Sequence, residues 1–412
     1  MENTRNMKMT PVGLIPEDWD VATIKDYGHL LSDGINPQQY REKDFVEYSM
    51  PAYDDGQSPT KCKGADMNSN RTQIRGEVLL FNKLNVRQKR VWYIENAPSN
   101  ALCSMEFLAF TSDRVDLRLL REILLQNSVT KGFESVSRGT SNSQKRIAPS
   151  DFLNFSFALP PLAEQHRIAD ALSSFDDMIV TLDKAITKKR QIKEGLMQQL
   201  LTGKTRLPEF YGEWLPKNLG KSALIKARIG WQGLTTKEYL DSGVYYLITG
   251  TDFKDGRIDW KNCHYVTRDR FEQDPYIKIQ KHDVLVSKDG TIGKVAYLDD
   301  IPGPGTLNSG VFVIRSKDKQ ISQRYLAKVF VSKYFDDFID SIVAGSTIVH
   351  LYQKDIVKFD FMVPPSIEEQ EQVCDFLEGV DNEIISLESK RDKYASLKQG
   401  MMQELLTGKT RL

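Results

Sequence analysis

Two long segments of the chain carry the same spacing of apolar residues. Between residues 168 and 200, and again between 373 and 405, apolar side chains recur at alternating intervals of four and three. This is the heptad pattern of a helix that packs along a seam against another helix. Each segment therefore predicts one helix of about 38 residues, roughly 57 Å long. The predicted seam residues are Ile168, Leu172, Phe175, Ile179, Leu182, Ile186, Leu196 and Leu200, and Val373, Leu377, Val380, Ile384, Leu387, Tyr394, Met401 and Leu405.

The ends of both helices are marked in the sequence. Pro161 and Pro365 push the residue before them toward extended backbone, so neither helix can begin earlier. Ser366 begins a capping box at the second helix. Gly203 and Gly408 stand where a left-handed residue is expected to end a helix.

A helix with an apolar seam needs a partner. Two matched helices in one chain favour antiparallel pairing within that chain, which would place two globular units at opposite ends of the pair, related by a pseudo-two-fold axis. A coiled coil between two chains is the alternative. Lys193, Arg391 and Lys398 fall in the seam, where they would weaken the pairing or accept helices of another partner.

The chain is an internal duplication. Residues 165–207 and 370–412 align at a constant offset of 205, with 19 of 43 positions identical. A weaker match relates residues 101–110 to residues 306–315. Each half therefore predicts one globular unit followed by one long helix.

The globular units show mixed patterns. Residues 245–248, 283–286 and 310–314 are typical of strands, and residues 117–126 and 323–338 are typical of helices. We expect a small curved sheet with flanking helices in each unit.

The predicted fold class is mixed α/β (α+β), with two duplicated globular domains separated by two long antiparallel coiled-coil helices. The predicted domains are a first globular domain, a helix with its linker, a second globular domain and a final helix. Their boundaries are 1–158, 159–206, 207–362 and 363–412.

Composition sets outer limits on the function. The 412 residues contain 56 basic and 56 acidic side chains, and the zero net charge argues at first against a nucleic-acid partner. No apolar run approaches 18 residues, so no membrane span is expected. The cysteines lie far apart without a paired motif, which is typical of reduced thiols in a cytoplasmic protein. They are Cys62, Cys103, Cys263 and Cys374.

Motifs for catalysis are absent from the sequence. Gly203-Lys204-Thr205 looks like the end of a phosphate-binding loop, but it follows a helix and lacks the glycine five residues earlier. The two Pro-Pro pairs do not fit the substrate loop of an amino-methyltransferase, and the histidines show no metal-ligand spacing. We therefore predict no catalytic residue and no metal site.

Charge is distributed unevenly along the chain. Residues 21–150 carry a net charge of +3 and residues 215–357 carry +4, whereas the remainder carries −7. The globular units also contain segments that mix cationic, amide and hydroxyl side chains, which grip phosphates and read base edges. Solvated surface loops are the alternative explanation. The predicted DNA-binding residues are Asn82, Lys83, Arg87, Lys89, Arg90, Arg138, Thr140, Lys145 and Arg146 in the first unit, and Lys288, Thr291, Lys294, Thr347, His350 and Tyr352 in the second.

These motifs together resemble one family. The segment 160–165, followed by a long helix that ends in residues 200–204, is similar to the conserved region of type I restriction–modification specificity subunits. The second copy at 364–409 matches it, and segments 10–19 and 283–294 resemble other hallmarks of that family. The first unit departs from the Ser-Lys-Asp-Gly-Thr pattern of 287–291, so its DNA-contacting loop stays open.

The resemblance implies a function for each part. Each globular unit would be a target-recognition domain that reads one half of a split double-stranded DNA target, and the helices would fix the spacer between the halves. The helices would also dock two methyltransferase subunits, which bind S-adenosylmethionine and methylate adenine. Two motor-nuclease restriction subunits would add ATP- and Mg²⁺-dependent cleavage, while this chain would hold no cofactor and no active site.

Two other functions stay open on the sequence. A coiled-coil adaptor whose globular units bind protein, without binding DNA, would show no salt-dependent DNA affinity. A nuclease with an unfamiliar metal site would cleave DNA by itself.

Overall fold

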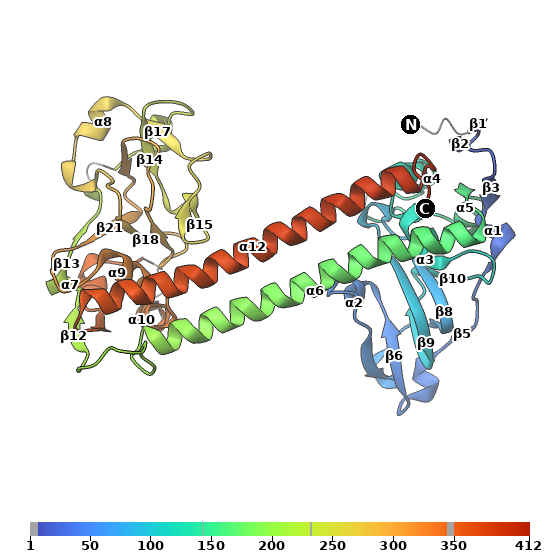
Figure 1. Cartoon of the computed structure of the whole chain (residues 1–412), viewed down its shortest axis with the longest axis horizontal. Coiled ribbons are helices and arrows are strands. Elements are labelled where there is room, and N and C mark those ends of the chain that lie inside the picture. The colour runs from blue at the N-terminus through green and yellow to red at the C-terminus, as the bar shows by residue number, and fades with distance from the viewer. Residues whose placement is uncertain (1–6, 142, 231–232, 344–349) are drawn as a thin grey trace. The chain divides into compact units, whose positions relative to one another are not determined.

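The chain folds into two compact units that share the long helices. The computed structural model describes residues 7–141, 143–230, 233–343 and 350–412. Unit 1 comprises Met1–Asp183 with Ser389–Leu412, and unit 2 comprises Lys184–Glu388. Helices α6 (Leu162–Leu200) and α12 (Ile367–Leu405) each contribute to both units (Figure 1). In the described part of the chain, no helix is both long enough and apolar enough to cross a bilayer.

Unit 1 is built on a seven-stranded sheet. Its strands run in the order β4-β10-β8-β9-β6-β7, and β5 pairs with β8. The long hairpin of β8 and β9 is antiparallel, whereas β6 joins β9 in parallel. The strands are β4 (His29–Leu30), β5 (Gly34–Ile35), β6 (Asp44–Tyr48), β7 (Thr60–Lys63), β8 (Arg71–Asn82), β9 (Val91–Ser104) and β10 (Phe107–Thr111).

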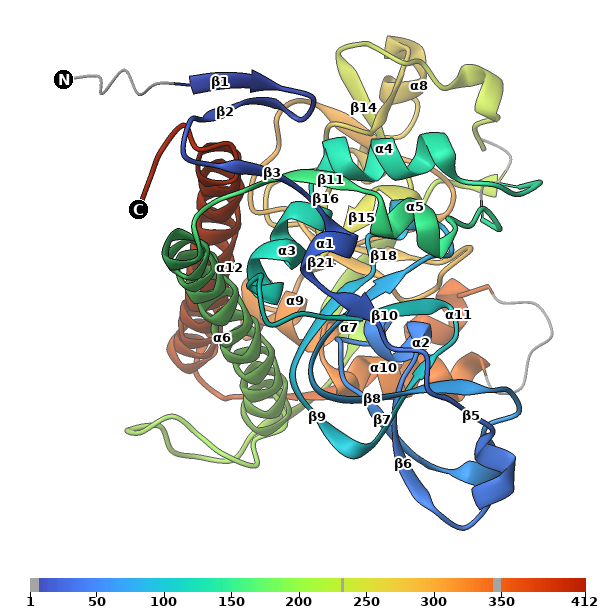
Figure 2. The ribbon, with the colours of Figure 1, turned by 90° about the vertical axis from the view of Figure 1, so that its right-hand side faces the viewer.

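Shorter elements surround this sheet. Strands β1 and β2 form an N-terminal hairpin, visible beside the long helices in Figure 2, and β3 pairs with β11. These strands are β1 (Met7–Thr10), β2 (Gly13–Pro16), β3 (Asp20–Thr23) and β11 (Ser156–Leu159). The helices are α1 (Ile24–Tyr27), α2 (Met50–Asp54), α3 (Leu117–Leu124), α4 (Asn127–Val136) and α5 (Pro149–Leu153).

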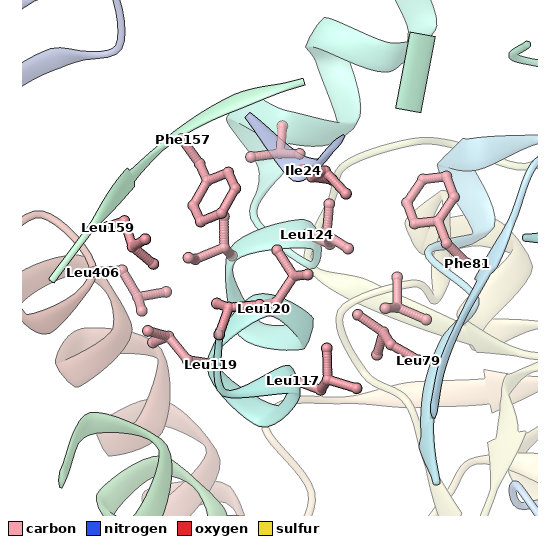
Figure 3. Close-up of a cluster of buried hydrophobic side chains, with 14 of the residues drawn as sticks. Ile24, Leu79, Phe81, Leu117, Leu119, Leu120, Leu124, Phe157, Leu159 and Leu406 are labelled. Carbon is pink, nitrogen blue, oxygen red and sulfur yellow. The ribbon is translucent and has the colours of Figure 1, made fainter. Parts of the chain in front are cut away.

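The core of unit 1 is centred on α3. Its leucines are almost completely buried, because the helix lies between the sheet and the ends of the chain. In Figure 3, Leu117 points toward Leu79 of the sheet, whereas Leu119 points toward Leu406 and Leu159. Each buried leucine contributes about 1.5–3 kcal/mol of transfer free energy. This core therefore joins the sheet to the segments that border the long helices.

Unit 2 divides its strands between two main sheets. One has the order β13-β21-β18-β19 and the other the order β17-β14-β20, in which β14 and β20 are parallel. A hairpin of β15 and β16 and the pair β12–β22 complete the strands. The strands are β12 (Leu215–Asn218), β13 (Ala223–Lys226), β14 (Tyr245–Ile248), β15 (Phe253–Lys254), β16 (Arg257–Ile258), β17 (His264–Val266), β18 (Val284–Ser287), β19 (Val295–Tyr297), β20 (Gly305–Leu307), β21 (Val311–Ser316) and β22 (Asp360–Val363).

The same series of elements leads into each long helix. Unit 1 runs α3, α4, α5, β11 and α6, and unit 2 runs α9, α10, α11, β22 and α12. The strand before the long helix pairs in both cases with a strand from the start of that half, β3 or β12. The predicted duplication is therefore confirmed in the fold. The unit 2 helices are α7 (Leu219–Ser222), α8 (Arg268–Glu272), α9 (Gln323–Phe330), α10 (Lys333–Val343) and α11 (Gln353–Ile356).

One predicted element is wrong in its length. The single helix expected over residues 323–338 is two helices, α9 and α10, separated at Val331 and Ser332. The hydroxyl of Ser332 donates to the carbonyl of Val329 at 2.6 Å, and its own carbonyl accepts from the amide of Phe335. Serine competes for backbone hydrogen bonds in this way and favours a helix boundary.

The long helices pair antiparallel within each unit. In unit 1 the Phe175 ring lies 6.0 Å from that of Tyr394, so an early part of α6 meets a late part of α12. In unit 2 the buried Ile186 packs with Val380 and Ile384, which come early in α12. The predicted fold class, mixed α/β with duplicated domains and antiparallel long helices, is therefore confirmed. Every residue predicted for the seam is buried or half-buried.

The repeated tail motif is held by charged side chains. In unit 1, Arg411 pairs with Asp18 at 2.7 Å and with the buried Glu164, which also accepts from the Trp19 indole at 3.2 Å. In unit 2, Arg206 pairs with Glu369, the equivalent of Glu164, at 2.6 Å. The Gly-Lys-Thr-Arg tail after α6 is therefore fixed in unit 2, and the tail after α12 is fixed in unit 1.

A buried glutamine follows each Pro-Pro pair and hydrogen-bonds to the first proline of that pair. Gln165 donates to the carbonyl of Pro160 at 2.9 Å and accepts from the amide of Asp116 at 3.1 Å. Gln370 makes the same contacts with Pro364 and with Ser322, at 2.9 and 2.8 Å. Each glutamine thus fixes the start of a long helix against the start of α3 or α9, which orients the globular part of each unit.

Candidate nucleic-acid interface

Two separate cationic segments of unit 1 lie together. The amide of Lys83 donates to the carbonyl of Glu106 at 2.9 Å, and the carbonyl of Lys83 accepts from the amide of Ile147 at 3.1 Å. The amide of Asn85 donates to the carbonyl of Lys145 at 2.8 Å. The predicted segments 82–90 and 138–146, apart from residue 142, therefore form one surface region, which we call site 1.

Unit 2 repeats this arrangement around Lys288. The amide of Lys288 donates to the carbonyl of Gly310 at 2.8 Å, and its carbonyl accepts from the amide of Leu351 at 2.9 Å. Lys83 and Lys288 are thus equivalent residues of the duplication. The predicted segments 287–294 and 350–352 form the matching region, site 2. Both residues are lysines and lie 205 residues apart, which is the offset of the repeat, although the residues around them differ.

Several cations of site 1 already have partners inside the unit. Arginine hydrogen-bonded to a carboxylate keeps its charge, and the pKa values of Arg90 and Arg146 are raised by these contacts. Such pairs fix where the guanidinium groups lie. The pairs are Arg87 with Glu134 at 3.1 Å, Arg90 with Asp54 at 2.7 Å and Arg146 with Glu106 at 3.0 Å.

The other predicted residues of site 1 differ in exposure. Arg138 and Thr140 are exposed, whereas Lys83 and Lys145 are half-buried. The ammonium of Lys89 is tied to the carbonyl of Leu125 at 2.8 Å. Asn82 is only 3% exposed, and its side-chain amide donates to the carbonyl of Glu106 at 3.3 Å. Asn82 therefore supports the loop from within.

Site 2 contains a tight loop built on a buried serine. The Ser287 hydroxyl donates to the carbonyl of Thr291 at 2.6 Å and accepts from the amide of Lys294 at 3.0 Å. Gly290 and Gly293 adopt left-handed backbone, with φ of 69° and 77°, which favours glycine. The side chains of Thr291 and Lys294 are exposed on this loop.

Aromatic rings border site 2. The Lys288 ammonium lies 5.2 Å from the centre of the buried Phe312 ring, and burial lowers the pKa of Lys288. His350 pairs with Asp289, and the half-exposed Tyr352 ring lies 4.4 Å from the imidazole of His350. The Lys354 ammonium lies 5.3 Å from the centre of the exposed Tyr352 ring. The predicted Thr347 lies outside the described residues.

Metal-binding and reactive groups do not gather at these sites. Among the residues that the structure describes, no three His, Cys, Asp or Glu side chains are grouped to hold a metal ion. The four cysteines are free thiols. Burial raises the pKa values of Cys103, Cys263 and Cys374 to about 12, which keeps them protonated and unreactive.

Comparison with known proteins agrees with this geometry. The family model described as "Type I restriction modification DNA specificity domain" matches residues 16–194 and 232–397. A putative type I restriction enzyme MjaX specificity subunit of Methanocaldococcus jannaschii is 25% identical over 99% of this chain and 97% of its own length. The MjaVIII specificity subunit of the same organism is 25% identical over 97% of this chain and 94% of its own length.

Two solved structures share the fold. One chain, from a study of complex assembly and conformational transition of the type I R-M system, has a TM-score of 0.61 at 18% identity, covering 96% of this chain and 99% of its own. The type I S subunit from M. genitalium has a TM-score of 0.59 at 15% identity, covering 97% of both chains. With the family model matching most of its length, this chain belongs to the type I restriction–modification DNA specificity family.

Proposed function

We propose that each unit of this specificity subunit reads one half of a bipartite double-stranded DNA target. The observation that carries the proposal is the equivalence of Lys83 and Lys288, whose backbones make the same two hydrogen bonds in the two units. Two equivalent cationic surfaces in one chain suit two half-sites. Their different side chains, Arg138 and Thr140 in site 1 against Thr291 and Lys294 in site 2, suit different base sequences.

The long helices are proposed to fix the spacer and to dock two methyltransferase subunits. Support comes from their continuity, because α6 and α12 each belong to both units. Adding or removing one turn within 176–195 and 381–400 together should change the spacer length. An unchanged spacer would refute this role for the helices.

Catalysis is assigned to partner subunits in this proposal. The specificity family supplies recognition, and S-adenosylmethionine, ATP and Mg²⁺ would bind the methyltransferase and restriction subunits. Two copies of each partner would complete the complex. The coiled-coil adaptor without DNA binding is disfavoured because the matched family model is a DNA specificity domain.

The test is methylation profiling with the full chain and its methyltransferase subunits. Methylated adenines should fall in two short sequences separated by a fixed, unread spacer. Arg138→Ala should relax or abolish only one of the two sequences, and Lys294→Ala only the other. A single continuous target, or loss of both halves from either substitution, would contradict the assignment.

A further inference from the structure

A cleft borders the long helix in each unit. The unit 1 cleft has a volume of about 1100 Å³ and lies between Val180 and Asp177 of α6, Arg118 and Arg121 of α3, and Tyr93 of β9. All of these residues belong to unit 1. The unit 1 cleft is distinct from site 1, with which it shares no lining residue.

The unit 2 cleft is its counterpart in the duplication. It has a volume of about 500 Å³ and lies between Ile385 of α12, Arg324 and Lys328 of α9, and Tyr297 of β19. Ile385 stands 205 residues after Val180, the offset of the repeat. Both side chains are about half exposed, at 49% for Val180 and 52% for Ile385. Each cleft therefore offers an aliphatic side chain at the same position of the repeat for contact with a partner.

The unit 1 cleft is lined by carboxylates that have no cationic partner. Glu77, Glu95, Asp113 and Asp177 are exposed along it. Among the described residues none of the four makes an ion pair, and the carboxylate of Glu77 accepts only the Tyr93 hydroxyl, at 2.9 Å. These four groups therefore present uncompensated negative charge to anything that enters the cleft.

The arginines of the same cleft do not neutralise them. Arg118 is engaged by Asp116 at 2.7 Å and by Asp170 at 2.6 Å. Arg121 pairs with the buried Glu122 and, at 3.1 Å, with Asp176 of α6. Both arginines are thus paired with other carboxylates, and the four exposed carboxylates make no ion pair among the described residues.

Most carboxylates of the unit 2 cleft are paired, and among those of its described lining residues only Asp255 makes no ion pair. Glu378 is paired with Arg324 at 2.7 Å, Asp381 with Lys193 at 2.5 Å, and Asp299 with Arg257 at 3.3 Å. One helix position even reverses sign, because the sixth residue of α3 is Glu122 and the sixth of α9 is Lys328. Two clefts of common origin therefore offer the same aliphatic contact but different charge.

We infer that the unit 1 cleft docks a Lys- or Arg-rich segment of the methyltransferase subunit, and that the unit 2 cleft binds its copy without this attraction. The inference rests on the proposed function for the identity of the partner. Charge complementarity selects the occupant, because unpaired carboxylates attract a cationic peptide and repel DNA phosphates. The two identical partners are consequently held with different affinity and different salt dependence.

The experiment titrates the full chain with purified methyltransferase subunit and counts bound copies by native mass spectrometry, with affinities from calorimetry. Measurements are made at about 50 and about 300 mM salt, where the Debye length falls from roughly 14 to 6 Å. The test variant is Glu95→Gln/Asp113→Asn/Asp177→Asn, at three exposed positions that make no ion pair. The matched control is Asp255→Asn in the unit 2 cleft.

Wild-type chain should bind one copy in a salt-sensitive step and a second copy in a weaker, salt-insensitive step. The triple variant should weaken only the salt-sensitive step, by about tenfold at low salt, and the control should change neither. If the wild type and the triple variant bind with equal affinity and equal salt dependence, the inference is wrong. Two bound copies in that experiment would still support the proposed function. Wild-type chain that binds no methyltransferase subunit would instead refute the proposed function.

Discussion

Lys398 lies in the apolar seam of the long helices, and its ammonium is 2.8 Å from the carboxylate of Asp176 on the opposite helix. It also lies 2.9 Å from the buried Glu122 of α3. Arg121 pairs with the same two carboxylates. The Lys398 side chain is only 11% exposed, so four charges meet where the heptad pattern calls for an apolar residue. A buried polar contact of this kind fixes the register of two helices.

Replacing Lys398 by Met should therefore destabilise unit 1. The change leaves Glu122 buried without this partner, and we expect a loss of about 2 kcal/mol in the free energy of unfolding. This loss is smaller than the roughly 3–5 kcal/mol that is lost when a fully buried ion pair is broken, because Asp176 is one-third exposed. Urea denaturation, followed by the fluorescence of a tryptophan in unit 1, measures this change in the free energy of unfolding. Lys193→Met, at the equivalent and more exposed pair in unit 2, should cost less than about 1 kcal/mol; equal costs would contradict this account.

Gly408→Ala should destabilise unit 1 by about 2–4 kcal/mol. Gly408 ends α12 with φ of 69°, and an added Cβ would overlap the Pro16 ring. Gly400→Ala is the matched control, because nothing lies within 4 Å of its Cβ position in the same helix. We expect it to stabilise the protein by about 0.5–1 kcal/mol. Thermal melts of the two variants should shift in opposite directions, and two downward shifts would count against the argument.

Glu238 should make unit 2 sensitive to acid. Its carboxylate accepts the amide of Thr235 at 2.9 Å and pairs with Arg270, and these contacts lower the pKa of Glu238 from its ordinary 4.5 to about 2. A depressed folded-state pKa adds stability above pH 4.5 that is lost as the pH falls toward 2. Glu238→Gln should therefore melt below wild type at pH 7. The gap should close as the pH falls from 4.5 to 2, and a constant gap would exclude this linkage.

Single lysines of sites 1 and 2 should contribute to the salt dependence of DNA binding. Lys83→Ala and Lys294→Ala should each lower the slope of log affinity against log salt by about 1, the value for one lost phosphate contact. Lys288→Ala should do the same, with some loss of stability because Lys288 packs on Phe312. Fluorescence anisotropy at several salt concentrations measures the slope. The exposed Lys25→Ala and Lys319→Ala are controls, and a slope change as large in these would remove the assignment of both sites.

Much of the architecture could be predicted from local sequence. The seam spacing, the prolines before the long helices and the glycines after them act through backbone geometry within a few residues. The left-handed backbone at Gly203 and Gly408 was predicted for this reason, and φ values of 72° and 69° confirm it. The strand at Tyr245–Ile248 was likewise predicted at its observed bounds. Repetition at an offset of 205 then extended each local inference to the other half.

Features made by distant contacts could not be predicted in this way. The offset of 205 pairs Lys83 with Lys288, but their shared backbone hydrogen bonds are made to residues far along the chain, and the sequences around the two lysines differ. The split between α9 and α10 likewise depends on a serine that bonds back to the helix before it.

The sequence by itself determined the duplication, the two long helices and the family, because heptad spacing, caps and repeated motifs are local and additive signals. Only the tertiary structure decided which charges are free. Arg90, Arg118 and Arg146 are engaged by carboxylates, whereas Glu95 and Asp113 are left unpaired along a cleft. Charge counts along a chain cannot separate these cases, since pairing depends on distances of a few ångströms between residues that the fold brings together.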